Sequence, residues 1–120
     1  MNKIVKKLWR TALLSGKYRQ ARDTLKADYS GGSRAYCCLG VLTNLYAKEH
    51  NMCFGAVLDR TASLDSDLSR RVMNWAGLNS RNPKVGDNRL ITINDGNDGC
   101  VGSIKPHNFK QIANLIQRYL

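Results

Sequence analysis

The sequence has no long run of hydrophobic residues. Its 120 residues include no stretch of about 18 consecutive apolar residues, the length that a membrane-spanning helix needs. The start, MNKIVKKLWRTALLSG, has the cations of a secretory signal, but they recur every few positions and divide the apolar residues. We therefore expect no membrane association, and we expect the chain to stay in the cytosol of the cell that makes it.

Signatures of catalysis are also lacking. The sequence has only two histidines, and it contains no HExxH motif, no nucleophile elbow and no pair of carboxylates at a useful spacing. Cys38, Asp95 and His107 could be combined into a catalytic set on paper. A nucleophile in the middle of an apolar helical face would be poorly accessible, however. We predict that the protein is not an enzyme and uses no cofactor.

The four cysteines lack the spacing of a metal site. Cys37 and Cys38 are adjacent, so on a helix they diverge by about 100°. Zinc sites use C-x2–4-C or H-x3–5-H spacings instead. His50 and Cys53 have a suitable gap, but the other ligands would have to come from distant positions. We interpret the cysteines as reduced thiols that pack as small apolar side chains, and we predict no metal.

Acidic residues are scarce and unevenly placed. The chain has 19 Lys and Arg against 9 Asp and Glu, a net charge of +10. Residues 1–26 hold eight of these cations and one acid, a net charge of +7. Such a cluster binds nucleic acid without sequence preference, or it is a solvated face that only maintains solubility. The candidate residues are Lys3, Lys6, Lys7, Arg10, Lys17, Arg19, Arg22 and Lys26, with Tyr18 and Tyr29 for base stacking.

The apolar periodicity predicts an α+β, mainly α, fold. We expect one domain over residues 1–120, with about four amphipathic helices, at most a small two-stranded sheet and a single core. Short strands are expected at residues 54–58 and 89–93, and the basic stretch 17–34 is expected to be an irregular loop. The first two expected helices are residues 2–14, with Asn2 as cap and Gly16 as end, and residues 34–49. The third has about ten residues, with a cap at Ser63 or Ser66 and a stop at Gly77. The last helix starts near Pro106 or Asn108.

The stretch SGGSR, residues 30–34, is a candidate anion site. Gly31 and Gly32 can adopt positive φ, and Ser33 and Arg34 would then stand at the N-terminus of the expected helix 34–49. The alternative is a flexible turn with a capping serine. The glycine-rich segment INDGNDGCVG does not have the register of an EF-hand, and we interpret it as a tight turn.

Four pieces of the chain resemble a family of small, mostly uncharacterised proteins encoded by bacteriophages and prophages. They are LWRTALLSGKYRQ, YCCLGVLTNLY, VMNWAGL followed by NP, and INDG followed by FKQIANLI. The resemblance implies a phage accessory protein expressed inside a bacterium, with no activity attached to the family. Members often have a third cysteine where this chain has Thr43, and this departure weakens any metal-binding role for that segment.

Together, the residues and the resemblance predict a non-enzymatic phage accessory protein acting in host takeover or counter-defence. It would bind nucleic acid or a host nucleoprotein complex through its basic N-terminal surface, in the cytoplasm of the host bacterium. Two alternatives are a binder of a nucleotide signal used in bacterial immunity, and a protein inhibitor of a host factor. The residues favour no particular oligomeric state.

Overall fold

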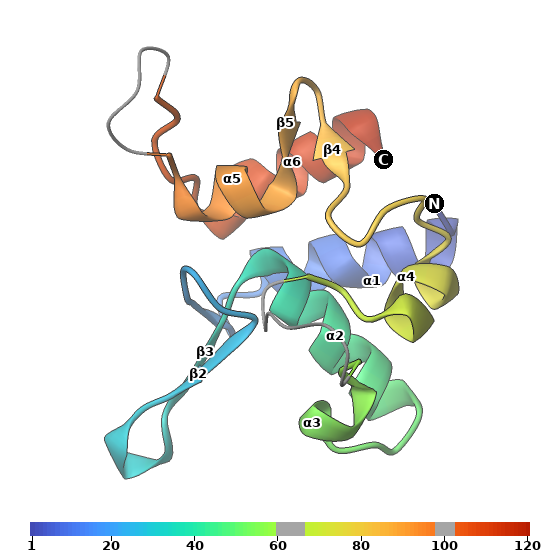
Figure 1. Ribbon diagram of the computed structural model, residues 1–120, viewed down its shortest axis with the longest axis vertical. Coiled ribbons are helices and arrows are strands. Elements are labelled where there is room, and N and C mark those ends of the chain that lie inside the picture. Colours follow the sequence, from blue (N-terminus) through green and yellow to red (C-terminus); the bar gives the residue numbers. More distant parts are fainter. Residues whose placement is uncertain (60–66, 98–102) are drawn as a thin grey trace.

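Helix α2, Cys38–Glu49, crosses the middle of the molecule, and most of the other helices pack against it (Figure 1). The computed structural model describes residues 1–59, 67–97 and 103–120. Within these ranges the chain forms six α-helices and two small sheets, which confirms the predicted mainly helical α+β fold. None of the described helices is long and apolar enough to cross a bilayer. The other helices are α1 Lys3–Leu14, α3 Phe54–Val57, α4 Arg70–Ala76, α5 Leu90–Asp95 and α6 Phe109–Tyr119.

Helices α1 and α6 begin where the sequence predicts them to begin. The side-chain oxygen of Asn2 accepts hydrogen bonds from the backbone N–H groups of Ile4 and Val5, at 2.9 and 3.1 Å. At α6, the side chains of Asn108 and Gln111 each accept a bond from the backbone N–H of the other residue, both at 2.9 Å. These caps are local, so each helix start is encoded within a few residues.

The structure has two small sheets, and the first occupies most of the stretch 17–34 that was predicted to be an irregular loop. In the first sheet the order is β1-β3-β2, with β1 parallel and β2 antiparallel to β3. The β2–β3 hairpin projects from the helical body and turns through a short 3-10 helix (Figure 1). The prediction of an irregular loop at residues 17–34 is therefore wrong. The strands are β1 Arg19–Gln20, β2 Lys26–Asp28, β3 Arg34–Tyr36, β4 Lys84–Val85 and β5 Asn88–Arg89.

Three other predicted elements also require correction. The predicted helix 34–49 begins only at Cys38, because residues 34–36 pair with β2 and β1. The predicted strand 54–58 is helix α3, and most of the predicted strand 89–93 belongs to helix α5. An apolar run of about five residues does not distinguish a strand from a buried helical turn. For α5, the side chain of Asn82 favours the helix by accepting a bond from Ile91 N at 3.1 Å.

Helix α4 ends at Gly77, as predicted, where the glycine adopts a left-handed conformation with φ of 68°. The predicted caps Ser63 and Ser66 lie outside the described residues. In the described part, the carboxylate of Asp59 accepts a bond from Arg70 N at 2.9 Å, and so satisfies a free N–H at the start of α4. Asp59 also pairs with the guanidinium of Arg81.

The core is centred on the first half of α2. Helix α1 contributes three buried residues to the core, Val5, Trp9 and Leu13, which follow one another at about one residue per helical turn. Trp9 is fully buried, and its indole N–H donates to the backbone carbonyl of Cys38 at 2.9 Å. Helix α6 adds a second apolar face: Phe109, Ile112, Ala113 and Ile116.

The first turn of α2 is buried, so its backbone N–H groups need partners inside the protein. The sulfur of Cys37 accepts a bond from Gly40 N at 3.3 Å, which makes this cysteine the N-cap. Asn94, only 1% exposed, accepts a bond from Cys38 N at 3.2 Å. Its amide nitrogen donates to the carbonyl of Ala21 at 2.9 Å. One buried amide therefore connects α5, α2 and the chain between β1 and β2.

Gly40 allows the chain before β2 to approach this turn. A Cβ atom at this position would lie 1.8 Å from the carbonyl oxygen of Leu25 and 2.8 Å from its carbonyl carbon. The same oxygen accepts a hydrogen bond from Cys37 N at 3.2 Å. No side chain can be accommodated here without moving the backbone.

We expect Gly40→Ala to lower the free energy of unfolding by more than about 3 kcal/mol, because the added methyl group collides with backbone atoms. Gly55→Ala is the matched control in α3, since its Cβ would meet nothing within 4 Å. That change should be neutral or stabilising by up to about 1 kcal/mol. Urea denaturation followed by circular dichroism measures both values. Equal stabilities for the two variants would contradict the assignment of Gly40 as a close-approach position.

Candidate nucleic-acid interface

The cations of α1 lie on the side of the helix that faces away from the core. Lys3, Lys6, Lys7 and Arg10 line one shallow hollow together with Gln117 of α6, with a volume of about 460 Å³. No acid lines this hollow. Within the described residues, no carboxylate lies within 4.0 Å of any of these four cations. The hollow is therefore a local concentration of positive charge that the described acids do not neutralise.

Helix α6 holds two of these cations in place. The ammonium of Lys6 donates to the carbonyl of Gln117 at 3.1 Å, and Nε of Arg10 donates to the carbonyl of Ala113 at 3.1 Å. Gln117 lies in the last turn of α6, where the helix dipole favours cations, whereas Ala113 lies near the middle of the helix. Lys and Arg carry several N–H donors each, so both side chains keep donors for a ligand.

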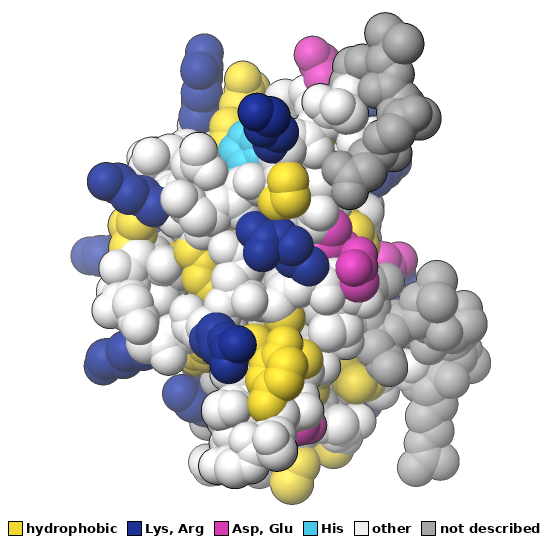
Figure 2. Space-filling view, turned by 90° about the vertical axis from the view of Figure 1, so that its left-hand side faces the viewer, with side chains coloured by type: hydrophobic (Ala, Val, Ile, Leu, Met, Phe, Trp, Pro, Cys, Tyr) yellow, Lys and Arg dark blue, Asp and Glu magenta, His cyan; other side chains and the backbone are white. Residues whose placement is uncertain are grey.

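The remaining basic residues form a less concentrated group. Lys26 and Arg34 both approach the carboxylate of Asp28, at 3.6 and 3.7 Å. Arg19 lies over the ring of Tyr29, with 4.7 Å between the guanidinium carbon and the ring centroid. Figure 2 shows Lys and Arg side chains at separate points over one face of the molecule, with apolar side chains between them. Pairs that are at least partly exposed, as these are, contribute little to stability and do not prevent ligand binding.

Lys17 and Arg22 complete the set of predicted cations. Both are exposed. Lys17 lies at the end of a second hollow, between α1 and α2, away from the hollow lined by Lys3 and Arg10. The structure thus brings four of the eight predicted cations into one site and distributes the others over the adjoining strands and loops.

The two tyrosines predicted to stack on bases differ in exposure. Tyr18 is half-buried, its hydroxyl accepts a bond from Asn44 at 2.8 Å, and its ring meets Tyr36 edge-on with centroids 5.3 Å apart. Tyr29 is 46% exposed. Stacking on a ligand is therefore open to Tyr29 beside Arg19, whereas Tyr18 already packs within the protein.

The SGGSR stretch does not lie at a helix N-terminus, which corrects the basis of the predicted anion site at Ser33 and Arg34. Gly31 and Gly32 do adopt positive φ, 83° and 81°, but they form the tip of the β2–β3 hairpin. Arg34 is the first residue of β3. Helix α2 begins at Cys38, and the bonds to Cys37 and Asn94 occupy its N-terminus.

The adjacent cysteines are packing residues with additional hydrogen bonds. Burial raises the pKa of the Cys37 thiol from 9.0 to about 12, and it raises the pKa of the Cys38 thiol well above 9.0. Both thiols are therefore protonated at neutral pH and are poor nucleophiles or metal ligands. In the described part of the chain, no three His, Cys, Asp or Glu side chains gather as metal ligands would.

The sequence interpretation missed one feature, an apolar hollow on the other side of α1. Ile4 and Leu8 are 74% and 41% exposed and line it. Their i, i+4 spacing places them on one face beside the buried stripe of Val5 and Trp9. This spacing is the sequence signal from which the hollow could have been predicted.

A comparison with known protein families gives one match. The model of a family described as a domain of unknown function (DUF8296) matches residues 1–120. The chain therefore belongs to this family. No curated protein and no solved structure matches the chain.

The raised thiol pKa values predict a loss of stability in alkali. Unfolded thiols release protons above about pH 9.0, whereas the native Cys37 thiol keeps its proton up to about pH 12, so stability falls as the pH rises between these values. Cys37→Ser keeps an N-cap oxygen and removes this titration. Its free energy of unfolding should fall less steeply than that of the wild type, by up to about 1.4 kcal/mol per pH unit. Urea denaturation of both proteins at several pH values in this range tests the prediction. An equal decrease of the free energy of unfolding with pH in both proteins would contradict it.

Proposed function

We propose that this member of the DUF8296 family is a non-enzymatic accessory protein of bacteriophage origin that binds a phosphate-bearing target. The target would be nucleic acid or a host nucleoprotein complex, met in the cytoplasm of the host bacterium, and the role would be host takeover or counter-defence. The origin and role rest on the sequence resemblance. The binding rests on one observation, the convergence of Lys3, Lys6, Lys7 and Arg10 on a hollow that contains no acid.

The geometry of the hollow suits a phosphate backbone better than a single base. Lys3 and Arg10 are seven residues apart, which is about 10 Å along a helix. This length corresponds to roughly three nucleotide steps along one strand of a duplex. Cations spaced along a helix contact successive phosphates without reading base edges. Binding would therefore be indifferent to sequence and sensitive to salt.

A nucleotide ligand is a second candidate, favoured by a separate hollow of about 420 Å³ near the end of α2. Lys26, Arg34 and Lys48 supply positive charge there, and Tyr36 and Phe54 supply aromatic surface. This combination suits a phosphate attached to a base. The carboxylate of Asp28 already pairs with two of the three cations, so the hollow on α1 supports the primary proposal more directly.

We expect the triple variant Lys3→Ala, Lys6→Ala and Arg10→Ala to bind nucleic acid at least about tenfold more weakly at low salt. The slope of log affinity against log salt should decrease by up to about 2.7, because each lost phosphate contact removes about 0.9. Fluorescence anisotropy with a labelled DNA duplex and a labelled single strand measures both quantities. Lys7 is left unchanged because it also borders the apolar hollow.

The matched control is the triple variant Lys84→Ala, Lys105→Ala and Lys110→Ala. These lysines are exposed and lie outside the α1 hollow. Their substitution removes the same total charge as the first triple variant. Thermal melting of both variants establishes that each is folded. Absence of binding by the wild type at low salt, or an equal loss in both variants, would contradict the proposal.

A further inference from the structure

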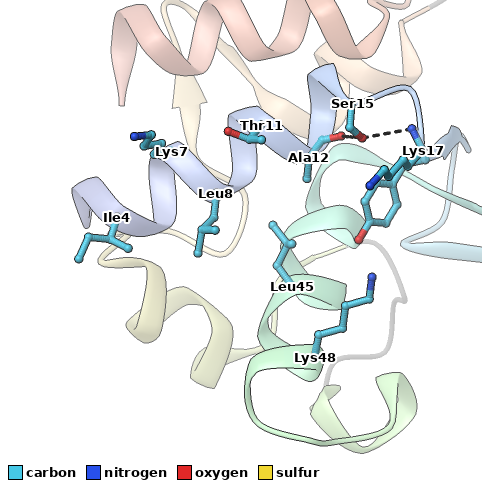
Figure 3. Close-up of a pocket in the computed structure, with 10 residues that line it drawn as sticks. Ile4, Lys7, Leu8, Thr11, Ala12, Ser15, Lys17, Leu45 and Lys48 are labelled. Carbon is cyan, nitrogen blue, oxygen red and sulfur yellow. Dashed lines mark hydrogen bonds between the residues drawn. The ribbon is translucent and has the colours of Figure 1, made fainter.

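The apolar hollow between α1 and α2 is the most distinct surface feature that the proposed function does not use. It has a volume of about 590 Å³, larger than the hollow that holds the α1 cations. Figure 3 shows Leu8 of α1 and Leu45 of α2 directed into the space between the two helices, with Ile4 at one end. The lining residues are Ile4, Lys7, Leu8, Thr11, Ala12, Ser15, Lys17, Tyr18, Leu45 and Lys48.

The floor of this groove is apolar surface that packing within the protein leaves exposed. Ile4 is 74% exposed and Leu8 is 41% exposed, whereas Leu45 is half-buried against the core. Single exposed apolar residues are common on protein surfaces. Here they are contiguous, they line one depression, and they come from two helices whose relative position the core fixes. A groove of this kind favours an apolar ligand that fits between the helices.

The rim of the groove carries charge of one sign. Lys7 lies on α1 toward one end, and Lys17 and Lys48 lie toward the other end (Figure 3). The ammonium of Lys48 is 5.7 Å from the centroid of the Tyr18 ring. None of the ten lining residues is acidic. The occupant must therefore be apolar in its centre and negatively charged at its edges.

We propose that this groove, defined by Ile4, Leu8, Leu45 and the rim lysines Lys7 and Lys48, binds an acidic amphipathic helix of a partner protein. The lining residues on α1 extend from Ile4 to Ser15, about 16 Å along the helix axis, which matches a partner segment of about three turns. Apolar side chains at i, i+3 or i+4, and i+7 of that segment would fill the groove. Its Asp and Glu side chains would meet the lysines at the edges.

A second copy of the chain does not fit this description. Each copy carries a net charge of +10, and the groove presents three lysines to any partner. Two such surfaces repel each other, so the charge complementarity points to a different, acidic protein. The site is also separate from the one proposed for phosphate binding, except that Lys7 borders both hollows.

An unbiased selection tests this proposal. The full-length protein is used to select from a yeast-displayed library of random helical peptides about 14 residues long, enough for the groove plus its ends. We expect the enriched peptides to share apolar residues at i, i+3 or i+4, and i+7, flanked by Asp and Glu. A synthetic peptide from the enriched set is then measured by fluorescence anisotropy against variants of the protein.

Substitutions inside and outside the groove test whether the peptide binds there. Ile4→Ser and Leu8→Ser should each weaken peptide binding by about tenfold or more. Leu14→Ser is the matched control, since Leu14 is 48% exposed on the same helix but does not line the groove. Lys48→Glu should weaken binding similarly, and Lys110→Glu, a charge reversal at an exposed site on α6, should leave it almost unchanged.

Three outcomes would overturn the proposal: no enrichment of any peptide, enriched peptides without acidic flanks, or binding that is insensitive to Ile4→Ser and Leu8→Ser. Where no peptide is enriched, binding of the protein to vesicles containing anionic lipid would assign the groove to a membrane surface instead. The triple variant Lys3→Ala, Lys6→Ala and Arg10→Ala keeps the groove intact. It should retain peptide binding even where nucleic-acid binding is lost, so the two proposals can fail independently.

Discussion

Helix α2 begins inside the protein, where its N-terminal N–H groups cannot reach water, and the other elements are arranged to satisfy this requirement. Cys37 caps the helix through its sulfur, and Asn94 reaches in from α5 to accept the bond from Cys38 N. The carbonyl of Cys38 accepts the indole N–H of Trp9. Removing one partner would leave a buried polar group unsatisfied, which costs about 1–3 kcal/mol. The position of α1 is therefore linked to the start of α2 by a hydrogen bond as well as by packing.

Because Trp9 fixes the orientation of α1, the helix presents two further faces at defined positions. One side places Lys6 against the Gln117 carbonyl in the last turn of α6, where the helix dipole attracts it, and Arg10 against the Ala113 carbonyl near the middle of α6. The other side leaves Ile4 and Leu8 exposed next to α2. A single amphipathic helix thus separates a cationic hollow from an apolar groove. The two candidate surfaces follow from the same packing arrangement.

The parts of the fold that sequence could predict are those encoded locally. Helices α1 and α6 have strong amphipathic periodicity, and their caps, Asn2 and Asn108, lie next to the segments they cap. The late start of α2 could not be predicted in this way. It depends on the pairing of β3 with β1, in which Gln20 pairs with Tyr36, 16 residues later in the chain. It also depends on the side-chain amide of Asn94. Helix α5 was missed because its β-branched residues favour a strand until contact with α2 is known.

The candidate site, too, could be predicted from the sequence only in its local part. Helical periodicity predicts that the α1 cations share a face, but it does not predict that α6 engages Lys6 and Arg10. Four like charges within about two helical turns repel one another, and the two bonds to α6 offset only part of that repulsion. Within the described residues, Lys3 and Lys7 make no hydrogen bond or ion pair that would offset the remainder. A bound anion would relieve this repulsion, so ligand binding and the stability of the α1–α6 pair are expected to reinforce each other.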